Sequence, residues 1–86
     1  MSWSEKTNVI IAEREKCPMC GGNVRLISII EPIRYYQIRC RPCDESWPLK
    51  TPVEITPGAV MISDATVIRC IREWNEIARK EKEKNE

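Results

Sequence analysis

The chain contains two cysteine pairs with the same spacing. Cys17 and Cys20 form the first Cys-x2-Cys turn. Cys40 and Cys43 form the second, and 19 residues separate the two pairs. A turn of this kind presents two sulfur atoms on one side and directs backbone N–H groups at them, and two such turns supply the four thiolates of a tetrahedral zinc site. The spacing therefore predicts one structural zinc ion whose four ligands all come from the protein.

The residues that follow each turn differ between the two pairs. Gly21 and Gly22 follow the first turn, where the backbone often needs a positive φ or a close approach to a neighbour. Asp44 and Glu45 follow the second turn. We therefore expect the second turn to be less regular than the first.

The length and the cysteine count agree with a metal site. A domain of 86 residues usually needs a metal ion or disulfides to be stable. Five cysteines are an odd number, and the N-terminal apolar run is surrounded by Glu5, Lys6 and Glu13, unlike a signal peptide. No stretch approaches the roughly 18 apolar residues of a membrane span. We expect a soluble, reduced, cytoplasmic protein.

Other readings of the cysteines remain open. Four unrelated cysteines would reach this paired spacing only by chance. A redox dithiol at Cys17-Pro-Met-Cys20 has the right spacing but no βαβ unit around it. A rubredoxin-like iron carrier would use the same four ligands, but three Trp, two Tyr and no Phe are few aromatics for it. Cys70 is expected to be a buried structural thiol outside the metal site.

Between the cysteine pairs the sequence predicts a β-hairpin. Residues 24–30 and 35–39 are rich in β-branched and aromatic residues, and residues 31–34 suit a turn. After Cys43, recurrent prolines predict an extended chain. A minor second hairpin is expected to join residues 53–55 to residues 60–62.

The best predicted helix lies near the C-terminus. Ser63 or Asp64 can cap it, and apolar residues then recur at helical spacing. These residues are Val67, Ile71, Trp74 and Ala78. We expect them to pack on the hairpin, and we expect the helix to fray from Lys80 onward because the remaining tail is charged.

The sequence thus predicts an α+β, zinc-ribbon-like domain, with a hairpin between two zinc turns and a helix packed back on it. Residues 17–80 form this domain, and residues 81–86 form a frayed tail. Residues 1–16 are expected to be a partly flexible leader. Within it, residues 9–12 could form a short strand or a helical turn, and Trp3 could anchor it.

Two surfaces are candidates for binding. On the second strand, Tyr35 and Arg39 share one face, which could bind nucleic acid, whereas Tyr36 and Ile38 share the other face. On the helix, Arg72 and Arg79 belong to a surface of mixed charge that suits a partner protein. The formal net charge is +1, and a four-thiolate zinc site would bring it to about −1. Strong nonspecific binding to nucleic acid is therefore not expected.

Nothing in the sequence indicates catalysis. The chain has no histidine and no glycine-rich phosphate loop, and its carboxylates lie singly on predicted surfaces. A zinc ion with four protein ligands has no open position for water or substrate. We therefore expect a protein that is not an enzyme.

The chain resembles the Lar family of phage and prophage zinc proteins named for restriction alleviation. The resemblance rests on Cys17-Pro-Met-Cys20-Gly-Gly, on the strand that enters the second cysteine pair from Tyr35, and on the helix that carries Trp74-Asn75. It implies a phage-encoded accessory protein in the bacterial cytoplasm. Such a protein would contact a host or phage protein, for example a component of a restriction-modification system. The alternative is a zinc-ribbon regulator that binds nucleic acid.

Overall fold

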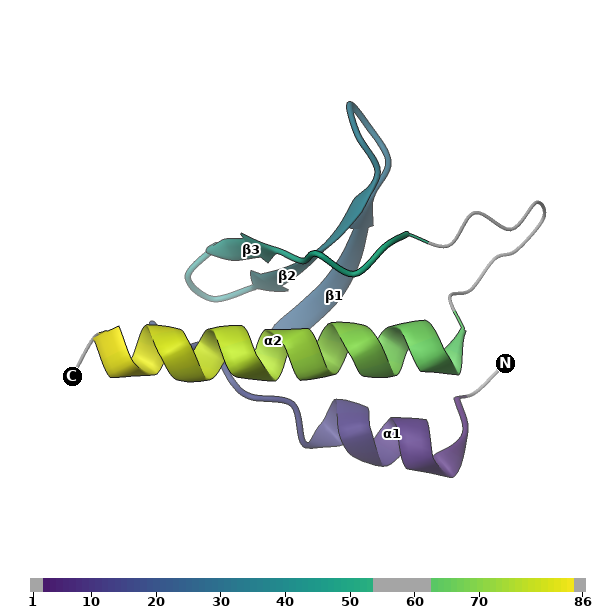
Figure 1. Cartoon of the computed structure of the whole chain (residues 1–86). Coiled ribbons are helices and arrows are strands. Elements are labelled where there is room, and N and C mark those ends of the chain that lie inside the picture. The colour runs from purple at the N-terminus through teal and green to yellow at the C-terminus, as the bar shows by residue number, and fades with distance from the viewer. Residues whose placement is uncertain (1–2, 54–62, 85–86) are drawn as a thin grey trace.

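The computed structural model describes residues 3–53 and 63–84. Their elements are, in chain order, α1 (Glu5–Ala12), β1 (Val24–Ile29), β2 (Tyr35–Cys40), β3 (Ser46–Pro48) and α2 (Asp64–Lys84). The three strands form one antiparallel sheet in the order β1-β2-β3. Helix α2 lies between this sheet and α1 (Figure 1). The predicted α+β fold, with a hairpin between the cysteine turns and a C-terminal helix, is confirmed.

Strand β2 lies in the middle of the sheet, between β1 and β3. The register of β1 with β2 pairs Val24 with Cys40 at one end and Ile29 with Tyr35 at the other. Side chains alternate along a strand, so Tyr36 and Cys40 are buried on the face toward α2. Tyr35 is half-buried on the outer face, and Arg39 is exposed there, as predicted.

Strand β3 was not predicted. The extended chain after Cys43 pairs with β2, and Trp47 lies opposite Ile38. The Trp47 ring packs against the Trp74 ring of α2 with a centroid distance of 5.0 Å. A strand of three residues with a proline has no alternating pattern that the sequence could display. The second predicted hairpin, between residues 53–55 and 60–62, lies outside the described residues except for Val53.

Helix α2 begins as predicted and continues further than expected. The Thr66 N–H donates to Ser63 Oγ at 3.3 Å, so Ser63 is the capping residue. The helix runs to Lys84 instead of fraying from Lys80. Its last turns are rich in Lys and Glu, which favour helix. They also carry ion pairs from Glu76 to Lys80 and from Glu81 to Lys84.

The buried residues of α2 fall into two groups. Cys70 and Trp74 join the core cluster that packs on the sheet. Val67 and Ile71 are equally buried but lie outside that cluster. Val67 and Ile71 are therefore buried as predicted, but they are not part of the cluster that contains the hairpin residues, so their packing on the hairpin is not confirmed.

The described part of the leader, residues 3–16, packs on α2 through α1 and the residues after it. Of the two structures considered for residues 9–12, the helix is present, with Ser4 as its N-cap. The Trp74 Nε1–H donates to the Glu15 carbonyl oxygen at 2.8 Å. The Glu15 N–H donates in turn to the Asn75 side-chain oxygen at 2.8 Å. The described part of the leader therefore covers part of α2.

Asp64 makes the attachment of α1 sensitive to acid. Its carboxylate accepts hydrogen bonds from Thr7 Oγ1 at 2.7 Å and from the Ser4 N–H at 3.1 Å. Hydrogen bonds from Ser4 and Thr7 hold the Asp64 pKa below its ordinary value. A lowered pKa means that this stabilisation is complete above the unfolded value of about 4 and is lost as the pH falls through the folded pKa.

We therefore expect Asp64→Asn to loosen α1 at neutral pH and to remove the acid dependence of its attachment. Hydrogen exchange of the α1 amides, measured against pH, checks this. Glu83→Gln removes an exposed carboxylate elsewhere on α2 and is the matched control. Equal α1 exchange in both variants would contradict the role of Asp64.

Candidate metal centre

The four predicted cysteine ligands lie together in the structure. Their Sγ atoms all lie within 4.8 Å of one another. The Sγ–Sγ distance is 3.6 Å between Cys17 and Cys43 and 3.3 Å between Cys20 and Cys40. A tetrahedral zinc site with Zn–S bonds of about 2.3 Å has S–S edges of about 3.8 Å. The cluster can therefore bind a metal ion with small adjustments of the side chains.

The first cysteine turn is closed by backbone hydrogen bonds. The Gly21 N–H donates to the Cys17 carbonyl oxygen at 2.8 Å, and the Cys17 N–H donates to the Gly22 carbonyl oxygen at 3.0 Å. The Met19 N–H points at Cys17 Sγ, and the Gly22 N–H points at Cys20 Sγ, both at 3.4 Å. These N–H groups stabilise negative charge on sulfur, which a metal-binding thiolate requires.

The second turn repeats two features of the first. The Cys40 N–H donates to the Glu45 carbonyl oxygen at 2.8 Å. Asp44 has a φ of 59°, and Gly21, at the equivalent position, has a φ of 74°. Aspartate tolerates this left-handed conformation better than most residues. Its carboxylate also accepts a hydrogen bond from Arg39 Nε at 3.0 Å.

Within the described part of the chain, the second turn has no counterpart of the bond from the Gly21 N–H to the Cys17 carbonyl oxygen. Pro42 stands where the first turn has Met19, so no N–H there can point at Cys40 Sγ. The second turn is therefore less regular than the first, as expected.

The cysteine cluster is joined to the hydrophobic core on one side. Cys17 and Cys40 are buried members of the core cluster that contains Trp74, whereas Cys43 is half-buried and Cys20 is exposed. Cys40 is also the last residue of β2. A metal ion here would bind the end of the central strand to the first turn, next to the core.

Burial and neighbouring groups make the four thiols unequal. Burial alone would raise the pKa of Cys17. Two kinds of neighbour outweigh it and lower that pKa to about 7: the backbone N–H groups of Cys20 and Met19, and the thiols of Cys40 and Cys43. Burial raises the pKa of Cys40 to about 12. For Cys43, the Glu45 N–H lowers the pKa, yet burial and the thiols of Cys17 and Cys20 raise it overall. A divalent cation must therefore displace protons from this site, so its affinity should rise with pH.

Gly22 allows the two cysteine turns to approach each other. A Cβ atom at this position would lie 2.6 Å from Pro42 Cγ, closer than packed atoms tolerate, and 3.3 Å from Cys20 Sγ. We expect Gly22→Ala to push the turns apart and destabilise the metal-bound domain by about 1–3 kcal/mol, the usual cost of overpacking. Competition with a chromogenic chelator would measure the loss as weaker metal affinity.

Gly21→Ala is the matched control for this prediction. A Cβ atom at Gly21 would meet nothing within 4 Å, so only its positive φ is strained. Pro42→Ala removes the atoms that an alanine at position 22 would strike. Pro42→Ala should therefore restore the metal affinity of the Gly22→Ala variant and leave that of the Gly21→Ala variant unchanged. No rescue would mean that the approach of the two turns is not what requires Gly22.

The other candidate site residues are not brought together. Tyr35 and Arg39 lie on the outer face of the sheet. Arg72 is exposed on α2, and Arg79 forms an ion pair with Glu15 at 3.6 Å. Cys70 is fully buried and lies outside the metal cluster.

Sequence reasoning missed Arg25, which only the strand register identifies. Arg25 lies directly across the hairpin from Arg39. Arg41 lines the same hollow as these two residues. The predicted hairpin already implied that one of residues 24–30 lies opposite Arg39. The sequence did not give the register, so it could not say which residue that is.

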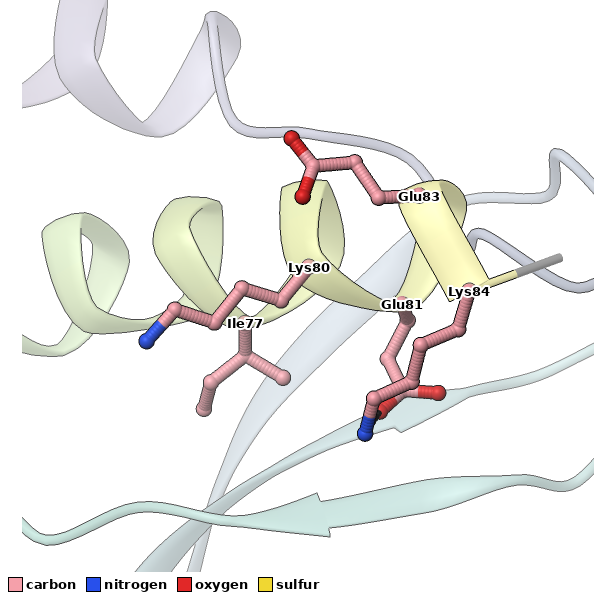
Figure 2. A pocket seen from close by; sticks show the side chains of 5 residues that line it. All are labelled: Ile77, Lys80, Glu81, Glu83 and Lys84. Atoms are coloured by element: carbon pink, nitrogen blue, oxygen red, sulfur yellow. Dashed lines mark ion pairs between the residues drawn. The ribbon is translucent and has the colours of Figure 1, made fainter. Parts of the chain in front are cut away.

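A hollow of about 420 Å³ lies beside the C-terminal part of α2 (Figure 2). Its lining comes from this one helix: Ile77, Lys80, Glu81, Glu83 and Lys84. Ile77 points toward the sheet, while the Glu83 carboxylate lies on the other side of the helix (Figure 2). Lys84 pairs with Glu81 at 3.7 Å. The charged side chains that line this hollow are of both signs, and they do not point to a common site that could hold a ligand.

Comparisons with models of protein families, with characterised proteins and with solved structures found no match to this chain. The resemblance to the Lar family therefore remains an expectation from the residues quoted above. Among the described residues, no helix has the length and apolar character needed to cross a bilayer.

Proposed function

We propose that Cys17, Cys20, Cys40 and Cys43 hold one zinc ion whose role is structural. The observation that carries this proposal is the convergence of four Sγ atoms within 4.8 Å, from two turns at the edge of the core. Four thiolates suit zinc and iron alike. Zinc is the better candidate because this chain has few aromatic residues for a rubredoxin-like electron carrier. When bound, zinc would supply folding energy, since the four cysteines fill its tetrahedral shell.

Metal analysis of the purified chain tests the proposal. We expect one zinc ion per chain, and we expect chelation to abolish the near-ultraviolet circular dichroism of the packed tryptophans. A metal-free protein with an unchanged spectrum in chelator would contradict the proposal. Iron in place of zinc, with reversible reduction, would favour the electron carrier.

The domain itself would act by contact, without catalysis. Ile30 and Ile33, in the connection between β1 and β2, are 66% and 67% exposed. The hairpin projects away from α2, so its turn is accessible (Figure 1). Exposed apolar side chains on a projecting turn favour insertion into an apolar pocket of a partner protein. Arg72 on α2 offers a second point of contact.

The resemblance to the Lar family suggests the setting of this contact. In that setting the chain is a phage or prophage accessory protein in the bacterial cytoplasm, and its partner belongs to a host restriction-modification system. Direct binding to purified restriction-modification subunits tests this proposal. We expect binding by the wild type that is lost in the Ile30→Ser, Ile33→Ser variant. Equal binding by both would contradict the role of the hairpin turn.

A further inference from the structure

The outer face of the sheet, turned away from α2, carries a cluster of arginines beside the cysteine site. Arg25 and Arg39 lie directly opposite each other on β1 and β2. Together with Arg41, Ile27 and Asp44 they line a hollow of about 250 Å³. We call Arg25, Arg39 and Arg41 the arginine cluster.

The charge of this cluster is not balanced within the described part of the chain. Like charges directly opposite each other on antiparallel strands destabilise a sheet. The Asp44 carboxylate pairs with Arg39. Arg25 and Arg41 form no ion pair with any residue that the structure describes. Three positive charges and one negative charge therefore line the hollow. The zinc-bound cysteine site beside it, with a net charge of about −2, would offset part of this excess. A bound anion would relieve the repulsion between the arginines directly.

Arginine favours one chemical class of anion in particular. The guanidinium group is planar and presents paired N–H donors that match the oxygens of a phosphate or carboxylate group. Several guanidinium groups around one open hollow can contact more than one such group. The cluster therefore suits a polyanion better than a single small ion.

The same face also carries an aromatic side chain. Tyr35 is half-buried there, four residues before Arg39 on β2, which is roughly 13 Å along the strand. Ile29 lies opposite Tyr35. A partly exposed ring at this distance from the arginines fits a chain that has both phosphates and flat bases. An acidic peptide would use the arginines but would gain little from the ring.

We propose that this face binds single-stranded nucleic acid. Phosphates occupy the hollow of the arginine cluster, and an unpaired base stacks on Tyr35. Asp44 competes with phosphate for Arg39 and limits the affinity. The site rests on the zinc-bound fold proposed above, because Arg39 and Arg41 flank Cys40. Since the whole chain carries a charge near zero, binding is moderate and falls steeply with salt.

Anisotropy of a labelled oligothymidylate, titrated with zinc-loaded full-length protein at several salt concentrations, tests the proposal. Arg25→Ala and Arg41→Ala should each weaken binding and lower the slope of log affinity against log salt by about 0.7. Tyr35→Ala should weaken binding by about fivefold or more. Asp44→Asn should strengthen it, because asparagine also tolerates the left-handed conformation.

Arg69→Ala is the matched control, because it removes the same charge from the exposed surface of α2 and should leave binding unchanged. An equal loss in Arg69→Ala and Arg25→Ala would show dependence on net charge alone and overturn the proposal. Equal competition by polyglutamate, with no effect of Tyr35→Ala, would assign the face to an acidic protein and also overturn it. Zinc content, measured for every variant, separates a failure of this site from a failure of the metal site.

Discussion

Cys40→Ser should remove the zinc ion and with it the cooperative fold. Cys40 is fully buried and ends the central strand. Its Sγ atom lies 3.3 Å from that of Cys20. A structural zinc ion contributes about 10–16 kcal/mol to folding in small domains. The whole stability of a small domain is only about 5–15 kcal/mol. We therefore expect no zinc in the purified variant and no cooperative thermal transition by circular dichroism.

Cys70→Ser is the matched control for this result. Cys70 is also fully buried, but it lies on α2 and outside the metal cluster. A hydroxyl group in this core should cost about 1–3 kcal/mol and leave one zinc ion per chain. Loss of zinc from Cys70→Ser, or retention of zinc and fold by Cys40→Ser, would overturn the assignment of the ligands.

Trp74→Ala should have the second largest effect, a loss of about 3–5 kcal/mol. Trp74 is fully buried, packs against Trp47, and donates its Nε1–H to the Glu15 carbonyl oxygen. Its removal leaves a cavity between the sheet and α2 and an unpaired carbonyl in the leader. Urea unfolding of the zinc-loaded protein measures the loss, and in a domain this small the variant should be largely unfolded.

Trp74→Phe separates the two contributions of this side chain. It keeps an aromatic ring in the core but removes the donor to Glu15, at a cost of about 1–3 kcal/mol for the unsatisfied carbonyl. Hydrogen exchange should then accelerate in the leader more than in the sheet. A cost as large as that of Trp74→Ala, with uniform exchange, would mean that the hydrogen bond does not attach the leader.

The sequence by itself determined the elements that depend on nearby residues. Two Cys-x2-Cys turns, the hairpin between them and the helix capped by Ser63 all follow from spacing and composition over a few residues. The buried faces of β2 and the burial of Trp74 followed from strand and helix periodicity. These features were predictable because each is encoded within its own element.

The tertiary structure decided what depends on residues far apart in the chain. The leader packs on α2 partly through the hydrogen bond between Trp74 and Glu15, which are 59 residues apart in the sequence. Strand β3 exists because the edge of β2 offers it hydrogen-bonding partners. Asp44 takes the conformation of a glycine because the second turn must close around the same point as the first. Arg25 joins Arg39 through the hairpin register. No local pattern records such contacts, since their energy arises only when separate segments meet.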